Sequence, residues 1–304
     1  MLTHRVSPLS PVHLRRASLA LLGLLLAACS GDGYQGRELG DVPTPLYQAH
    51  AHNDYEHDLP LLEALGHGFM SVEADVFVAP LPAEVSALLP NLPLAGQLYV
   101  AHDPQDIRPE RTLDSLYLQP LWERFSALGA IYPEQDRPLQ LLVDFKTEAE
   151  TTWQALEARL QDYLPMLSRI DNGQSIEGAV RIVISGNRPT ATLASLPTRA
   201  AFIDGRLSDL DQPQPVELMP LISDNWGNHF SWTGDGPMPA EEQTQLLDIV
   251  QRTHALGASL RFWATPDAPG PEREAVWTVL ADAGQDHINT DDLAGLAAFL
   301  RERE

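Results

Sequence analysis

Short apolar runs alternate with longer stretches of helical periodicity along most of this chain. Nine apolar runs have the length and pattern of β-strands, at residues 46–52, 70–77, 97–101, 139–145, 179–185, 200–204, 217–223, 258–263 and 286–290. Between most of them the periodicity predicts helices, at residues 58–67, 112–129, 149–164, 189–196, 240–256, 272–283 and 292–301. Strands and helices in alternation are typical of parallel βα units.

The number of units favours an α/β fold of one particular kind, a (β/α)8 TIM-type barrel in a single domain. The chain has 304 residues, and such barrels use about 250 as one domain. Residues 97–101 are then part of a hairpin or a third strand. A doubly wound open sheet is the alternative, but no glycine-rich dinucleotide loop follows the first expected strand, which weakens it.

The first residues read as a targeting signal. Residues 1–28 contain three arginines and no acid, and they end in an apolar run that is too short to span a bilayer. The Leu-Ala-Ala-Cys sequence ending at Cys29, the only cysteine, resembles the lipobox of bacterial lipoproteins, in which the cysteine is acylated. A plain secretory signal with an incidental cysteine is the alternative.

This reading divides the chain into three parts: a lipoprotein signal peptide at 1–28, a flexible tether at 29–44 and the barrel at 45–304. It predicts an exported protein with lipidation at Cys29, attached to the membrane through this anchor in the bacterial cell envelope. Ser30 follows the cysteine where an aspartate would retain the protein at the inner membrane, so the outer membrane is expected.

The charge balance excludes one class of partner. Asp and Glu total 42 against 20 Lys and Arg, giving a net charge of −22. Nucleic-acid binding needs a basic surface, so no nucleic-acid partner is expected, while the oligomeric state stays open. An acidic enzyme that handles phosphate needs a metal ion or a few well-placed cations.

Acidic residues occur at the ends of the expected strands, where barrel enzymes place their active sites. Glu73 and Asp75 share one face of a strand because side chains alternate, and Asp144 lies on a later one. Like charges so close repel unless a proton or a cation separates them. Oxygen ligands of this kind suit one divalent cation, Mg²⁺ or Ca²⁺.

Cationic and titratable residues follow the same pattern. Lys146, the only lysine, shares a face with Asp144, and its ammonium suits a phosphate oxygen; a simple ion pair is the alternative. His52 and His102 each follow an apolar strand, as general base and acid would at either side of a phosphodiester. Arg188 has two possible roles, binding a phosphate group or capping a loop.

The combined pattern resembles the glycerophosphodiester phosphodiesterase and phosphatidylinositol phospholipase C superfamily of TIM-barrel phosphodiesterases. A first-strand histidine is followed by Glu-x-Asp, then His-Asp, then an acid-x-Lys strand. The segments 52–57 and 71–75 are closest to a little-characterised microbial and fungal branch, here taken as a bacterial lipoprotein branch. The resemblance spans roughly residues 46–292.

The resemblance implies a metal-dependent phosphoric diester hydrolase acting on a phosphodiester small molecule or a lipid headgroup. His52 and His102 would be catalytic. Lys146 and Trp263 would bind the substrate. The metal would be held by Glu73, Asp75, Asp144 and Asn53.

The chain departs from the family pattern in three ways. The His-Arg-Gly of true glycerophosphodiesterases is replaced by His52-Asn53-Asp54, which removes one phosphate contact, and the usual third metal glutamate is Asp144. The gap between Asp75 and His102 is long because of an insertion at residues 79–96. The protein is alternatively a surface lipoprotein that binds a phosphorylated headgroup without turnover. Less favoured is a metal-dependent amidohydrolase using His50-x-His52, since the middle strands lack the further histidines that such enzymes need.

Overall fold

A computed structural model describes residues 43–79, 81 and 96–304 of the chain. Its central sheet contains eight parallel strands, Leu46–Ala51 (β1), Phe69–Val78 (β2), Leu139–Phe145 (β4), Val180–Gly186 (β7), Phe202–Gly205 (β8), Leu221–Asn225 (β9), Ser259–Trp263 (β10) and His287–Thr290 (β11). The sheet closes into a barrel because β1 pairs in parallel with both β2 and β11. The predicted single-domain (β/α)8 barrel is therefore confirmed.

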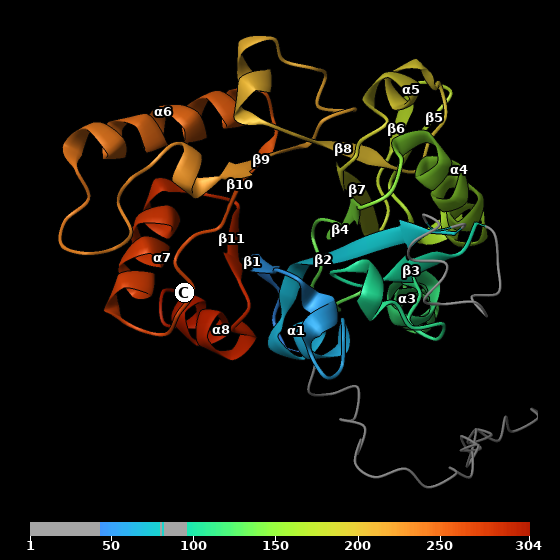
Figure 1. The fold of residues 1–304 in the computed structure, drawn as a ribbon, viewed down its shortest axis with the longest axis horizontal. Coiled ribbons are helices and arrows are strands. Elements are labelled where there is room, and N and C mark those ends of the chain that lie inside the picture. The colour runs from blue at the N-terminus through green and yellow to red at the C-terminus, as the bar shows by residue number, and fades with distance from the viewer. Residues whose placement is uncertain (1–42, 80, 82–95) are drawn as a thin grey trace, which may run out of the picture. The chain divides into compact units, whose positions relative to one another are not determined.

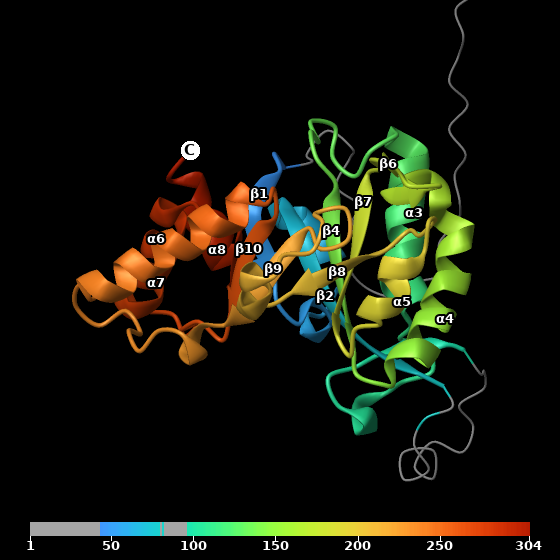
Figure 2. The same ribbon diagram turned by 90° about the horizontal axis from the view of Figure 1, so that it is seen from above.

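Helices surround the barrel (Figures 1 and 2). They are Leu62–His67 (α1), Gln119–Leu128 (α3), Ala149–Leu160 (α4), Thr190–Ser195 (α5), Ala240–Ala255 (α6), Pro271–Ala283 (α7) and Leu293–Arg301 (α8). In both views α6, α7 and α8 lie on one side and α3, α4 and α5 on the other. After β8 the chain forms only a 3₁₀ helix, Leu207–Asp211 (η6). Within the part of the chain that the structure describes, no helix combines the length and hydropathy that crossing a bilayer requires.

Residues 97–101 form the expected hairpin rather than a barrel strand. Leu98–Val100 (β3) pairs antiparallel with the last residues of β2, so the two form a hairpin at the end of that barrel strand. Two other details differ from the sequence prediction. The strand expected at 217–223 begins only at Leu221, because Pro220 before it has no N–H to donate to a ladder. A short hairpin of Arg169–Asp171 (β5) and Gln174–Ile176 (β6) lacks an apolar face and was not expected.

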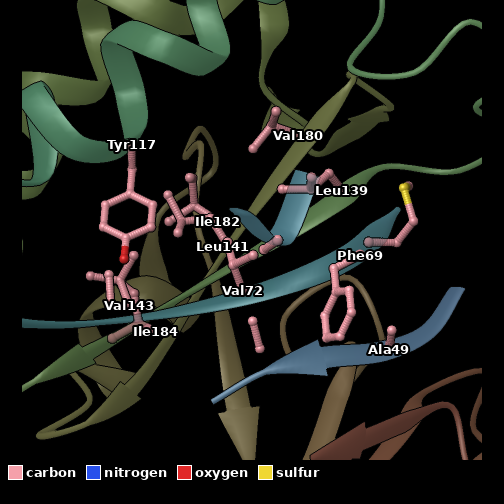
Figure 3. Packing of buried hydrophobic residues seen from close by; sticks show 14 of the residues in the cluster. Ala49, Phe69, Val72, Tyr117, Leu139, Leu141, Val143, Val180, Ile182 and Ile184 are labelled. Atoms are coloured by element: carbon pink, nitrogen blue, oxygen red, sulfur yellow. The ribbon is translucent and has the colours of Figure 1, made fainter. Parts of the chain in front are cut away.

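Alternation along the strands separates the apolar core from the polar interior of the barrel mouth. Val72, Val143 and Ile184 face outward and are buried beneath the helices, where Tyr117 joins them (Figure 3). Each strand residue next to these points the other way, into the barrel. The residues beside Val72 and Val143 include Glu73 and Asp144, so the packing that buries the outer face also fixes where the acids point.

The signal peptide predicted at 1–28, most of the tether at 29–44 and the lipidation site Cys29 lie outside the described residues. These boundaries stay predictions.

Candidate active site

Three carboxylates meet at the C-terminal end of the barrel. Asp75 of β2 and Asp144 of β4 are register partners on neighbouring parallel strands. Glu73 lies two residues before Asp75 on the same face. Each of the three offers an oxygen atom, and these oxygens lie within 4.8 Å of one another, so the cluster could hold a metal ion. The sequence prediction that these acids lie close together is consistent with this geometry.

Glu73 is held ionised by two neighbours inside the barrel. The guanidinium of Arg261 on β10 donates to Glu73 Oε2 at 2.6 Å, and His50 Nε2 lies 3.2 Å from the same oxygen. Burial alone would raise the pKa of Glu73, but these two groups outweigh it and hold the pKa well below its usual range. Both contacts use Glu73 Oε2.

His50 supports Glu73 from beneath. It is fully buried, and burial and the nearby Arg261 charge place its pKa well below the usual value, so the ring is neutral. Gln140 Nε2 donates to Ser71 Oγ at 2.8 Å, and Ser71 Oγ lies 2.7 Å from His50 Nδ1. In this series of hydrogen bonds His50 Nδ1 accepts from Ser71, and His50 Nε2 donates to Glu73. Both ring nitrogens are thus engaged, which argues against the amidohydrolase alternative.

Asp75 has the least complete set of partners. It is 1% exposed, and its Oδ2 accepts from the Tyr55 hydroxyl at 2.7 Å and lies 2.9 Å from the ammonium of Lys146. Its Oδ1 is buried without any hydrogen-bond partner among the described residues. Burial and the charge of Glu73 raise the pKa of Asp75 to about 6. An oxygen that is buried, unpartnered and beside two other carboxylates fits a cation ligand.

Lys146 lies between two of the acids, with its ammonium 3.2 Å from Asp144 and 2.9 Å from Asp75. Burial would lower its pKa, but the two carboxylates raise it. Three carboxylates against the cations of Lys146 and Arg261 leave one formal negative charge. A divalent cation would reverse this to one positive charge, which suits a phosphodiester monoanion.

His52 is oriented by an acid from the other end of the chain. It follows β1, and its Nδ1 lies 2.8 Å from Asp291 Oδ1, just after β11. Its backbone N–H donates to the carbonyl of Thr290, which keeps the two strand ends together. With Nδ1–H donated to Asp291, Nε2 is left as a proton acceptor. The side chain is partly exposed, at 27%.

His102 reaches the acids through the β2–β3 hairpin. The N–H of Ala101 donates to the carbonyl of Asp75 at 3.3 Å, which brings the next residue over the site. His102 Nδ1 lies 3.0 Å from the Tyr55 hydroxyl and 3.6 Å from Asp75 Oδ2. The ring is 54% exposed, so its other nitrogen is accessible to a substrate.

The last two predicted residues also lie at the mouth. Asn53 has a left-handed backbone, at φ 45°, and its Oδ1 accepts from Tyr55 at 2.9 Å. Trp263 ends β10, where it is half-buried and opposite Asn225 in register. Tyr55 thus contacts Asn53, Asp75 and His102 together. Among the described residues, no hydrogen bond joins Trp263 to the three acids.

Comparison with known proteins decides the family. The model of the AIM6-like phosphodiesterase domain matches residues 41–204, more than half of the chain. The chain belongs to this family. The model of the glycerophosphoryl diester phosphodiesterase family matches a further segment, residues 259–294, which contains β10 and β11.

Several curated relatives of the chain come from fungi. Altered inheritance of mitochondria protein 6 of Eremothecium gossypii is 29% identical over 315 residues, covering 92% of this chain and 76% of the relative. The homologue from Arthroderma benhamiae is 27% identical, covering 84% and 83%. A glycerophosphodiester phosphodiesterase structure from Parabacteroides distasonis superposes with a TM-score of 0.50 at 12% identity, covering 86% and 99%. That likeness shows the fold.

These relatives correct the predicted location. The sequence ending at Cys29 led us to expect an exported lipoprotein of a bacterial envelope, but the curated relatives come from yeasts and other fungi. They point to a eukaryotic protein, so the bacterial envelope prediction is wrong. The N-terminal pattern of basic residues, an apolar run and a cysteine is short, so it can occur by chance. Similarity over most of the chain cannot, and it therefore outweighs the motif.

Family and fold together support a phosphodiester hydrolase. Three residues of the site were not predicted from the sequence. They are Tyr55, Arg261 and Asp291, the last of which is the partner of His52. A signal existed for Arg261, a charged residue in the middle of an apolar strand on the same face as Trp263. No sequence pattern signals that Asp291 meets His52, because 239 residues separate them.

Proposed function

We propose that the protein is a metal-dependent phosphodiester hydrolase that acts on glycerophosphodiesters or phospholipid headgroups by histidine acid–base catalysis. The observation that carries the proposal is the clustering of Glu73, Asp75 and Asp144, with oxygens within 4.8 Å of one another. Lys146 contacts the same cluster, and two imidazoles lie at the same mouth, that of His52 after β1 and that of His102 after β3.

The acids would hold one divalent cation, Mg²⁺ or Ca²⁺, because both prefer carboxylate oxygens. When bound, such an ion neutralises the charge that develops on the phosphoryl oxygens. Asn53 would add an amide oxygen to the set. With a cation bound to Asp75 and Asp144, the ammonium of Lys146 would be free to hold a phosphate oxygen. Trp263 would line the substrate side of the mouth.

His52 fits the general base and His102 the general acid. Asp291 accepts the Nδ1–H of His52 and so orients the ring, which leaves His52 Nε2 to take the proton of the attacking hydroxyl, from water or from the substrate itself. The oxygen attacks phosphorus and the bond to the leaving oxygen breaks. His102 then donates its proton to that oxygen.

The test is a panel of glycerophosphodiesters and bis(p-nitrophenyl) phosphate, scored after chelation and after adding back Mg²⁺ or Ca²⁺. We expect activity only with a cation. His52→Ala should lower kcat by about 10²- to 10⁴-fold, which is the usual contribution of a general acid or base. Asp291→Asn should cost less, since the ring stays in place.

Asp248→Asn is the matched control, because this acid lies exposed on α6 and only approaches Arg252. It should keep full activity while Asp75→Asn loses both activity and bound metal. Tight binding of glycerophosphodiesters without any turnover would instead support a non-catalytic binding protein. Full activity in EDTA would contradict the metal dependence.

A further inference from the structure

Arg188 is a cation without an acidic partner at the catalytic end of the barrel. It follows β7, and its side chain is partly buried. Its guanidinium donates to the backbone carbonyl of Asp204, and within the described residues no carboxylate lies within ion-pair distance of it.

A second arginine lies beside it. Arg206, just after β8, donates through Nη1 to Asp204 Oδ2 at 2.7 Å. The hydroxyls of Ser185 and Ser223 donate to the same oxygen, each at 2.7 Å. Asp204 is fully buried and therefore fixes the Arg206 side chain, which is itself 26% exposed. Both guanidiniums thus contact the same residue, and the carboxylates of Asp209 and Asp144 act on Arg188 only from beyond ion-pair distance.

The pair is adjacent to the proposed catalytic centre. Asn187, next to Arg188, is held against the end of β4. Its backbone N–H donates to the carbonyl of Phe145 at 3.0 Å, and its side-chain amide donates to the carbonyl of Thr147. Those residues flank Lys146. Arg188 therefore stands one strand further around the mouth than Lys146.

Leaving two guanidiniums together has an electrostatic cost. Burial and the neighbouring charge of Arg206 lower the pKa of Arg188, and they outweigh the nearby carboxylates of Asp204, Asp209 and Asp144, which raise it. A dianion between them would relieve this repulsion, and the planar fork of each guanidinium matches phosphate oxygens in pairs.

We propose that Arg188 and Arg206 bind a phosphate monoester carried by the substrate, separate from the phosphodiester that is cut. This inference rests on the proposed function and narrows it. The preferred substrate is a phosphodiester whose headgroup carries a second, terminal phosphate. Lys146 and the acids hold the scissile group, and the two arginines hold the second phosphate on the β7–β8 side.

The test compares glycerophosphoinositol with glycerophosphoinositol 4-phosphate, which differ by one phosphate monoester. For the wild type, kcat/KM should be at least about 10-fold higher with the phosphorylated diester, the usual value of a charge-assisted hydrogen bond. Arg188→Gln should remove most of that ratio. Arg206→Lys keeps a positive charge beside Asp204 but loses the planar guanidinium, so it should reduce the ratio of the two kcat/KM values. Arg252→Gln is the control, an exposed arginine paired with Asp211 on the outside of the barrel, and it should keep the wild-type ratio.

The affinities of both diesters are measured in parallel by calorimetry. If the wild type cleaves neither, the hydrolase proposal fails, and the ratio of the two dissociation constants decides the arginine site alone. An equal kcat/KM and an equal affinity for the two diesters would overturn the inference. So would an Arg188→Gln protein whose preference matches that of the wild type while it stays folded by circular dichroism.

Discussion

At the residue scale, acids of the same chemical type have very different environments in this site. Glu73 has a guanidinium and an imidazole as partners, so it is held ionised. Asp75 has one unpartnered buried oxygen and a pKa raised to about 6. A metal ion stabilises a buried carboxylate most where the protein supplies the fewest partners for its charge. Loss of Asp75 should therefore weaken metal binding most.

Asp54 is a second buried acid with an incomplete set of partners, and it leads to a pH prediction. Its Oδ2 accepts from the Leu61 N–H and the Tyr117 hydroxyl, while Oδ1 has no hydrogen-bond partner among the described residues. Burial raises the pKa of Asp54 from 3.8 to about 6. The folded state therefore binds this proton more tightly than the unfolded chain does, and ionisation destabilises the fold as pH rises from 4 to 6.

Asp54→Asn should accordingly stabilise the protein above pH 6 and have little effect near pH 4. The amide keeps both accepted hydrogen bonds and cannot ionise, and the gain at pH 7.5 should be about 3 kcal/mol. Urea unfolding at pH 4.5 and pH 7.5 measures it. Asp58→Asn, an exposed neighbour, should change neither value. An Asp54→Asn protein that is less stable than the wild type at pH 7.5 would contradict the explanation.

At the element scale, the contact between β4 and β7 shapes the metal cluster. Gly186 ends β7 with φ +64°, and a Cβ there would lie 2.4 Å from Asp144 Oδ1 and 2.6 Å from the carbonyl of Phe145. The close approach of the two strand ends therefore needs glycine at this position. It also leads the chain directly to Arg188.

Gly186→Ala should weaken both the fold and metal binding. The substitution adds the cost of a left-handed alanine, about 1 kcal/mol, to a clash that must displace Asp144 or β4. Gly284→Ala is a matched control, because its φ is +84° but a Cβ there meets nothing within 4 Å. Denaturant unfolding and metal titration of the two variants separate backbone strain from the clash. Equal losses in both variants would show that Asp144 does not depend on Gly186.

At the scale of the whole molecule, the fold gathers acids inside a barrel that belongs to a strongly acidic chain with net charge −22. Ionisation of Asp75 and Asp144 opposes folding unless a cation is present, because burial and the neighbouring carboxylates raise the pKa of both groups. Binding of a cation to the folded state alone stabilises it by mass action.

Divalent cations should therefore raise the melting temperature, and more so at pH 8 than at pH 5.5, where Asp75 is largely protonated. At 100 times the dissociation constant the gain is about 2.7 kcal/mol, or about 5–10 °C for a domain of this size. Scanning calorimetry with EDTA, Mg²⁺ or Ca²⁺ measures it. Asp75→Asn should lose the shift, whereas Asp248→Asn should keep it. A shift that is independent of pH would count against carboxylate ligands.

Much of this architecture was predictable because it depends on local pattern. The apolar runs and helical periods identify all eight barrel strands to within a few residues, since burial on both faces demands continuous apolar segments. The alternation rule alone placed Glu73 beside Asp75 and Asp144 beside Lys146. The boundary at Leu221 and the β5–β6 hairpin were missed, because turn geometry and exposed pairing leave little hydrophobic signal.

The sequence by itself determined the fold class, the parallel barrel and the acids, lysine and histidines that end its strands. Closure of the barrel decided the rest, because it joins β1 to β11 and so brings Asp291 to His52 and Arg261 to Glu73 from more than 180 residues away. Such partners follow from the three-dimensional path of the backbone, which local patterns of polarity do not encode.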